Sequence, residues 1–288
     1  MDVIVPMPKS LEIQALNVND LLTKIYYYNV NNVDRIVLDF SGTTWFSAEM
    51  STLLSVIIRD LQAQGKSIAT KGLKPTVNEF LKKNNFLPSF GIGEKLPDNN
   101  GTIIPFVEFQ SEATKQINDY LDNQAFSIMD EKITSVQNEI IKSAIYEITH
   151  NIFEHSQSNF FYMCGQFFPR KNRLAFTISD KGITIPKNIK NKSNIRLSTS
   201  SDYIDWATLE GKSTKKGASG LGLFELKTNM KQLGRLVIIS NKGFNSYSVD
   251  GIIKKELNNP FNGTMIYLDY DLDRNLTTTL DNINNLLF

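Results

Sequence analysis

The sequence predicts a mixed α/β protein built from two domains. Three observations support this prediction: a strand–helix–strand order over residues 35–70, a turn-rich segment before residue 105, and a second series of helices and strands after it. The 288 residues are enough for two domains of ordinary size. With 41% hydrophobic and 21% charged residues, the composition is typical of a globular protein with apolar cores.

Composition and charge exclude several classes of protein. The formal net charge of +1 gives no electrostatic reason to expect nucleic acid or an acidic membrane as a partner. One cysteine, Cys164, excludes an internal disulfide and is typical of a reducing compartment. No stretch approaches the roughly 20 apolar residues that span a bilayer, and residues 1–11 lack the apolar core of a signal peptide. We therefore expect a cytoplasmic protein without membrane contact.

The first region alternates strand and helix patterns. Residues 35–40 are a short apolar run, which predicts a buried strand. Residues 48–64 carry apolar side chains at a helical period, and Gly65 ends that pattern as a cap. Residues 67–70 predict the next strand, and 76–84 another helix. A strand–helix–strand order of this length implies a parallel pair of strands.

A change of composition marks the domain boundary. Residues 88–104 are rich in proline and glycine and end in Asp98-Asn-Asn-Gly101, which is typical of turns and linkers. We therefore place one domain at 1–95 and the other at 105–288. The second domain is predicted to contain helices at about 111–123, 132–156 and 221–233 and strands at 159–168, 173–179, 235–240 and 264–270.

Two polar residues at helical spacing form the first candidate site. Glu147 and Asn151 are four residues apart, so they stack on one side of the predicted helix, at the margin of its apolar stripe. The neutral oxygen of Asn151 can ligate Mg²⁺, and Glu147 can orient or deprotonate a water or hydroxyl. Taken alone, this pair also fits a solvated pair beside a core stripe. His155, four residues further on, faces the same side or has a structural role.

Asp180 and a later glycine-rich segment add two further elements. Asp180 ends a predicted strand, where a carboxylate can accept from an exocyclic amine, and Gly182 would let a flat ring approach the backbone. The alternative is a simple Asp-Lys-Gly turn. Gly217, Gly220 and Gly222 precede a predicted helix, so they expose N–H groups to an anion, with lysines just upstream. The alternative is a flexible loop.

Taken in order, these segments resemble the GHKL superfamily of gyrase-type and mismatch-repair ATPases, histidine kinases and anti-sigma-factor serine kinases. Residues 147–151 resemble its N box, 180–182 its adenine box and 212–223 its lid and second glycine box. The resemblance covers roughly 110–270 and implies a Bergerat-type α/β sandwich. It implies that Asn151 coordinates Mg²⁺, Glu147 acts as base and Asp180 and Gly182 bind the adenine of ATP. It also implies nucleotide contacts by Lys212, Thr214, Lys215, Gly217, Gly220, Leu221, Gly222 and Thr264.

Residues 1–90 resemble more weakly a STAS domain, the fold of anti-sigma-factor antagonists. The similarity lies in residues 36–40, in Phe46-Ser47-Ala48 before a helix and in 65–68. Antagonists usually carry Asp-Ser-Ser-Gly at that helix start, whereas here Phe46, Ala48 and Glu49 depart from the pattern. A docking module is the alternative. If the chain has kinase activity, Ser47 or Ser51 is the nearest candidate acceptor.

The expected function is a Mg²⁺-ATP-binding regulatory switch with slow hydrolysis. One alternative is a protein serine/threonine kinase of the anti-sigma-factor type, and another is a non-catalytic nucleotide-sensing scaffold. The polar segment 183–218 is expected to be irregular, as a lid over the phosphates or as a disordered stretch. The STAS-like domain is expected to contact a protein partner. A homodimer is left open, and no direct contact with nucleic acid is expected.

Overall fold

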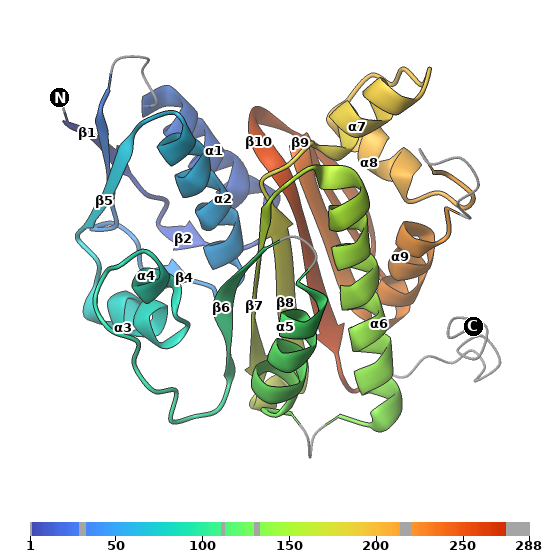
Figure 1. Ribbon diagram of the computed structural model, residues 1–288, viewed down its shortest axis with the longest axis horizontal. Coiled ribbons are helices and arrows are strands. Elements are labelled where there is room, and N and C mark those ends of the chain that lie inside the picture. The colour runs from blue at the N-terminus through green and yellow to red at the C-terminus, as the bar shows by residue number, and fades with distance from the viewer. Residues whose placement is uncertain (1, 29–32, 111–112, 130–132, 214–219, 275–288) are drawn as a thin grey trace.

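The computed structural model describes residues 2–28, 33–110, 113–129, 133–213 and 220–274. The protein is a mixed α/β structure, as the sequence predicts. A three-stranded sheet belongs to the N-terminal part and a five-stranded sheet to the C-terminal part (Figure 1). Helices lie between the two sheets and on the far face of the larger one (Figure 1).

The N-terminal sheet is parallel, with the strand order β1-β3-β5. The predicted parallel pair, β3 and β5, is confirmed, and Gly65 ends the intervening helix with a positive φ of 81°. The sequence analysis missed β1, a strand of five residues that ends at Pro6. The elements of this part are β1 (Asp2–Pro6), β2 (Ser10–Leu11), α1 (Ala15–Tyr28), β3 (Arg35–Asp39), β4 (Trp45–Phe46), α2 (Met50–Ala63), β5 (Ser67–Lys71), α3 (Pro75–Lys83) and α4 (Phe86–Ser89).

The larger sheet is antiparallel throughout its described strands, in the order β6-β7-β8-β10-β9. Its strands are β6 (Ile103–Gln110), β7 (Phe160–Phe168), β8 (Arg173–Asp180), β9 (Gly234–Ser248) and β10 (Gly251–Asp271). A single turn of 3-10 helix, η3 (Pro169–Lys171), joins β7 to β8. The sequence analysis missed β6, whose start lies in the predicted linker. It also predicted only parts of β9 and β10, at 235–240 and 264–270. The remaining parts of these two strands pair with each other as a hairpin of mostly polar residues.

The helices of the C-terminal part include two that the sequence analysis missed. The irregular stretch expected at 183–218 is wrong for its described part, which contains α7 (Ile185–Lys192) and α8 (Ser200–Ala207). Threonine caps begin both: Thr184 accepts from Lys187 N, and Thr199 forms a capping box with Asp202. The remaining elements are α5 (Thr114–Tyr120), η1 (Leu121–Phe126), α6 (Ser135–Asn151), η2 (Ile152–Ser156) and α9 (Gly222–Leu233).

Both faces of the five-stranded sheet are buried. On β8, Leu174, Phe176 and Ile178 belong to the apolar cluster under α5, α6 and α9. The alternate residue Ala175 belongs to a second cluster, which is formed mainly by α1, α2 and the parallel sheet. A strand buried on both faces reads as a continuous apolar run, which is why this segment lacks a period of two.

Helix α2 packs directly on the central strands through buried polar contacts. Thr52 Oγ1 lies 3.0 Å from Thr177 Oγ1 and accepts a hydrogen bond of 2.8 Å from Ser179 Oγ. The Cys164 thiol donates to the carbonyl of Ala48. The N-terminal part is therefore the second cover of the large sheet, and the two predicted domains share one apolar cluster.

This shared cluster predicts that residues 103–288 fail to fold stably alone. Without the N-terminal part, one sheet face would expose Phe106, Tyr162 and Val237 to water, together with their apolar neighbours. We expect the fragment to aggregate or bind a hydrophobic dye, and to be rescued by co-expression of residues 1–102. Size-exclusion chromatography and thermal melting test this. A monodisperse fragment with the melting temperature of the full chain would contradict the prediction.

Candidate functional site

A cavity of about 390 Å³ lies between the end of α6, the loop before α9 and the strands β8 and β10. It brings together most of the residues predicted from the sequence. Its lining includes the predicted Glu147, Asn151, Asp180, Lys212, Gly220, Leu221, Gly222 and Thr264. Gly182 lies behind Asp180, and Thr214, Lys215 and Gly217 lie outside the described residues.

Asp180 closes one end of the cavity. It is the last residue of β8, is only 2% exposed, and stands opposite Thr264 in the register of β10. The Gly182 amide and the Ser156 hydroxyl interact with its carboxylate, yet Oδ1 has no hydrogen-bond partner within the described residues. Burial raises the pKa of Asp180 to about 8. The cavity therefore ends in a buried acceptor that still lacks a donor.

The turn after Asp180 requires a glycine at position 182. A β-carbon there would collide with the carbonyl of Ser156 and lie 2.6 Å from Asp180 Oδ1. The same Ser156 carbonyl accepts from the amide of Ile183. The absence of a side chain thus lets the Asp180 turn close against the end of η2. Sequence analysis did not identify Ser156, although it directly follows the predicted His155.

Thr264 is held by a serine that the sequence analysis did not identify. Its Oγ1 lies 2.9 Å from Ser240 Oγ, and Ser240 Oγ accepts a hydrogen bond of 2.9 Å from the amide of Ile185. Ser240 is completely buried and ends the strand segment that was predicted at 235–240. This network ties the start of α7 to the two strands beneath the cavity.

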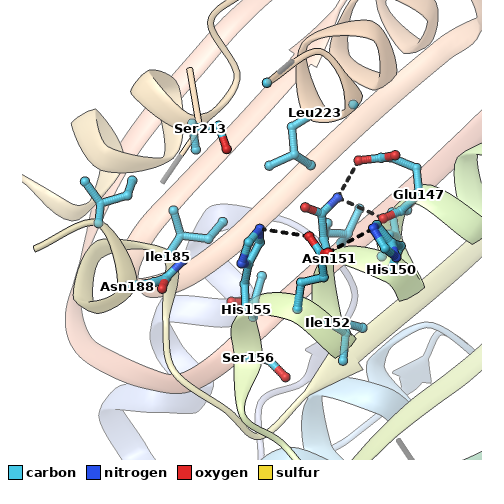
Figure 2. A pocket seen from close by; sticks show the side chains of 18 of the residues that line it. Glu147, His150, Asn151, Ile152, His155, Ser156, Ile185, Asn188, Ser213 and Leu223 are labelled. Carbon is cyan, nitrogen blue, oxygen red and sulfur yellow. Dashed lines mark hydrogen bonds and ion pairs between the residues drawn. The ribbon is translucent and has the colours of Figure 1, made fainter. Parts of the chain in front are cut away.

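Glu147 and Asn151 form the opposite end, as their helical spacing predicts. Asn151 Nδ2 donates to Glu147 Oε1 at 2.7 Å and to the Glu147 carbonyl at 2.8 Å (Figure 2). Both amide hydrogens are used in this way, which leaves Asn151 Oδ1 as the atom for a cation or another donor. Helix α6 ends at Asn151, and the chain continues in the wider π-helical turn η2, so the uniform helix predicted to residue 156 is wrong for its last turn.

The Glu147 carboxylate lies against the first residue of α9. A β-carbon on Gly222 would collide with Glu147 Oε1, so a larger residue at this position would displace the Glu147 carboxylate. The helix N-terminus adds partial positive charge at this point. Burial, and after it the charge of Glu147, raises the pKa of Glu225 in the first turn of α9. Two carboxyl groups and a helix N-terminus therefore meet at this end of the cavity.

The chain comes back on itself beside this end. Gly220 has a φ of 64°, and a β-carbon there would lie 2.7 Å from the backbone of Lys212. Left-handed backbone and close contact both require glycine at this position. This contact places Lys212 and Gly220 together in the lining of the cavity.

The segment between Asp180 and Lys212 supplies an apolar wall that the sequence analysis missed. Ile183, Ile185 and Ile189 line the cavity, as does Trp206 of α8. They were missed because the segment was interpreted as irregular. On the other side, Glu154 lies between two histidines, with carboxylate oxygens 3.3 Å from His150 Nε2 and 3.8 Å from His155 Nε2 (Figure 2). His155 lines the cavity, which is one of the two alternatives that the sequence left open.

Comparison with known proteins adds no family to these observations. No protein-family model matches the chain, and a search of curated proteins found no match. Within the described parts of the chain, no group of three or more His, Cys, Asp or Glu side chains is placed to hold a metal ion. No helix in those parts has the length and apolar character needed to cross a membrane.

The burial of Asp180 predicts how stability depends on pH. Its pKa is raised from 3.8 to about 8, so between these values the folded protein holds a proton that the unfolded chain has lost. This group therefore destabilises the fold as pH rises through that window, by the order of a few kcal/mol. Asp180→Asn should melt at a higher temperature than wild type at about pH 9, with the difference shrinking towards pH 4.

Thermal melting across this pH range tests the prediction, and the exposed Asp250→Asn is the matched control. A constant difference between Asp180→Asn and wild type at all pH values would show that this carboxyl does not titrate as inferred.

Proposed function

We propose that this protein is a Mg²⁺-ATP-binding regulatory switch with slow ATP hydrolysis. The observation that carries the proposal is the buried Asp180 carboxyl, which has an oxygen without a donor and stands beside Thr264 at the apolar end of the cavity. The exocyclic amine of adenine would donate to that oxygen. A cavity of about 390 Å³ with isoleucine walls is of the size and character of small-ligand sites.

The opposite end supports binding of phosphates together with a cation. Gly220 and Gly222 leave the backbone at the start of α9 open to an anion. Glu147 and Glu225 would repel a polyphosphate at the same place, which makes a divalent cation necessary. Asn151 Oδ1 is the oxygen that remains for this cation, and Mg²⁺ favours oxygen ligands and keeps several waters. When bound, Mg²⁺ would neutralise phosphate charge.

Glu147 is the candidate base. The amide of Asn151 fixes one of its carboxylate oxygens at 2.7 Å, which orients the base relative to the cation ligand on the next turn of the helix. A positioned carboxylate of this kind can take a proton from an attacking water or from the hydroxyl of an acceptor. Lys212, at the edge of the cavity, would contribute positive charge near the phosphates.

The fold assignment belongs to the same proposal. We assign residues 105–288 to a GHKL-type ATP-binding domain and residues 1–95 to a STAS-like regulatory or docking domain. The antiparallel sheet with α5, α6 and α9 on one face supports the first assignment, and the parallel sheet β1-β3-β5 supports the second. As part of the same proposal, the STAS-like domain contacts a protein partner. A homodimer remains open.

The two acceptor serines suggested by the sequence, Ser47 and Ser51, lack structural support. Ser51 is completely buried and accepts a hydrogen bond of 2.8 Å from Asn84. Ser47 is 8% exposed and lies on the N-terminal part, which covers the sheet face opposite the cavity. Neither Ser47 nor Ser51 is therefore placed to accept a phosphate from a nucleotide in the first cavity.

The first test is nucleotide binding by titration calorimetry. At about pH 9, above the pKa of Asp180, wild type should bind Mg²⁺-ATP with a dissociation constant below about 1 mM, and Asp180→Asn should bind about 10- to 100-fold more weakly, because a charge-assisted hydrogen bond is lost. Thermal melting of Asp180→Asn checks that this variant remains folded. Absence of Mg²⁺-ATP binding by wild type would refute the proposal.

The second test concerns the reaction. Glu147→Gln keeps the shape of the side chain and removes the base, so ATP binding should persist while turnover falls by roughly 10²- to 10⁴-fold. Glu210→Gln, an exposed residue, is the matched control. Radiolabelled ATP should be separated into free phosphate and labelled protein, which distinguishes hydrolysis from phosphotransfer. Equal turnover of wild type and Glu147→Gln would assign Glu147 a structural role.

A further inference from the structure

A second cavity, of about 900 Å³, lies where the N-terminal part meets the large sheet. Trp45, Ser47 and Glu49 line it from the N-terminal side, and Arg173, Arg235 and Tyr267 from the sheet. It is found at the start of β8 and the end of β10, whereas Asp180 lies at the other end of β8, where it pairs with Thr264 in the interior of β10. The two cavities are therefore separate sites.

A buried carboxyl group faces this second cavity without a full set of partners. Glu49 precedes the first residue of α2, yet its side chain makes no capping hydrogen bond. The residue is 5% exposed, and Oε2 has no hydrogen-bond partner within the described chain. Burial raises the pKa of Glu49. A buried carboxyl oxygen without a donor is costly and marks a place for a ligand's donor.

Two of the arginines that line the cavity, Arg173 and Arg235, differ in how many of their N–H groups already donate hydrogen bonds. Arg173 Nε and Nη2 both donate to Asp269, and Nη2 also donates to Tyr267 at 2.7 Å. Arg235 Nη2 donates to the carbonyl of Ile13 at 3.1 Å, but its buried Nε has no partner among the residues described. Arg235 also lies over the Tyr267 ring, 5.4 Å from its centroid, which holds the guanidinium in place.

Two groups that line the cavity thus have an unused hydrogen-bonding atom: the acceptor Oε2 of Glu49 and the donor Nε of Arg235. A ligand with only negative charge would face Glu12, Glu49, Asp250 and Asp273. A ligand with only positive charge would face Lys171 and the guanidinium of Arg235. We propose that this cavity binds a small zwitterion of the amino-acid class, with its ammonium on Glu49 and its carboxylate on Arg235. This proposal does not depend on ATP binding in the first cavity.

The two tryptophans of the chain provide separate reporters for the two cavities. Trp45 lines the second cavity, and Trp206 lines the first. In the full-length Trp206→Phe protein, fluorescence therefore reports on the second cavity alone. The probes are the individual proteinogenic L-amino acids, with n-butylamine and butyrate as ligands that carry only one of the two charges.

At least one L-amino acid should change the Trp45 fluorescence saturably, with a dissociation constant below about 1 mM. Butylamine and butyrate should each bind at least about 10-fold more weakly. In the Trp206→Phe background, Glu49→Gln and Arg235→Gln should each weaken binding by about 10- to 100-fold, whereas the exposed Glu210→Gln should not change it.

Three results would overturn the proposal: no saturable change with any L-amino acid, butyrate or butylamine binding as tightly as the best amino acid, or unchanged affinity in both Glu49→Gln and Arg235→Gln. Thermal melting checks that the variants fold. If they do not, the comparison of the three kinds of probe on the Trp206→Phe protein decides the question. Loss of ATP binding in the first cavity would leave these outcomes unaffected.

Discussion

The packing of α2 on the central strands of the large sheet is the contact on which the rest of the structure depends. It converts a sheet that would have one open face into a buried layer, with β8 covered on both sides. The interface is partly polar, because Thr52 meets Thr177 and Ser179 within hydrogen-bonding distance. These buried hydroxyl groups fix the position of α2 on the sheet, because a shift of α2 along the sheet would leave them without hydrogen-bond partners.

The burial of Asp180 follows from this arrangement. The residue ends a strand that has no open face, and a β-carbon on Gly263 of the neighbouring strand would collide with its carbonyl. From the other side of the sheet, the next residue, Lys181, reaches Asp60 of α2 at 3.3 Å. The N-terminal part therefore positions the turn that carries Asp180 without lining the first cavity itself. The unfavourable burial of the Asp180 carboxyl therefore occurs at a position where a hydrogen-bond donor of a ligand can compensate for it.

Local patterns predicted the strands and helices that are apolar and regular, together with the spacing of Glu147 and Asn151. They did not predict the elements whose formation depends on contacts between residues that are distant in the sequence or on specific helix caps. Strand β6 begins in a turn-rich segment and is stabilised by pairing with β7 and by its side chains in both apolar clusters, and the short helices α7 and α8 depend on their threonine caps. Ser240 and the second cavity could not be predicted, because Glu49 and Arg235 are distant in sequence and line one cavity only after the N-terminal part packs on the sheet.

Strands β8 and β10 join the two cavities physically. Thr264 and Tyr267 are three residues apart on β10, and each lines a different cavity. A ligand shifts an equilibrium only by its difference in affinity for the states involved, and coupling between two sites is reciprocal. A ligand on Glu49 and Arg235 would tie α2 to the sheet, which favours the packed position of the N-terminal part. The same packing holds the turn that carries Asp180, because Lys181 contacts Asp60 of α2. Binding of a ligand in the second cavity would therefore favour the packing of α2 on the sheet that also positions Asp180 in the first cavity.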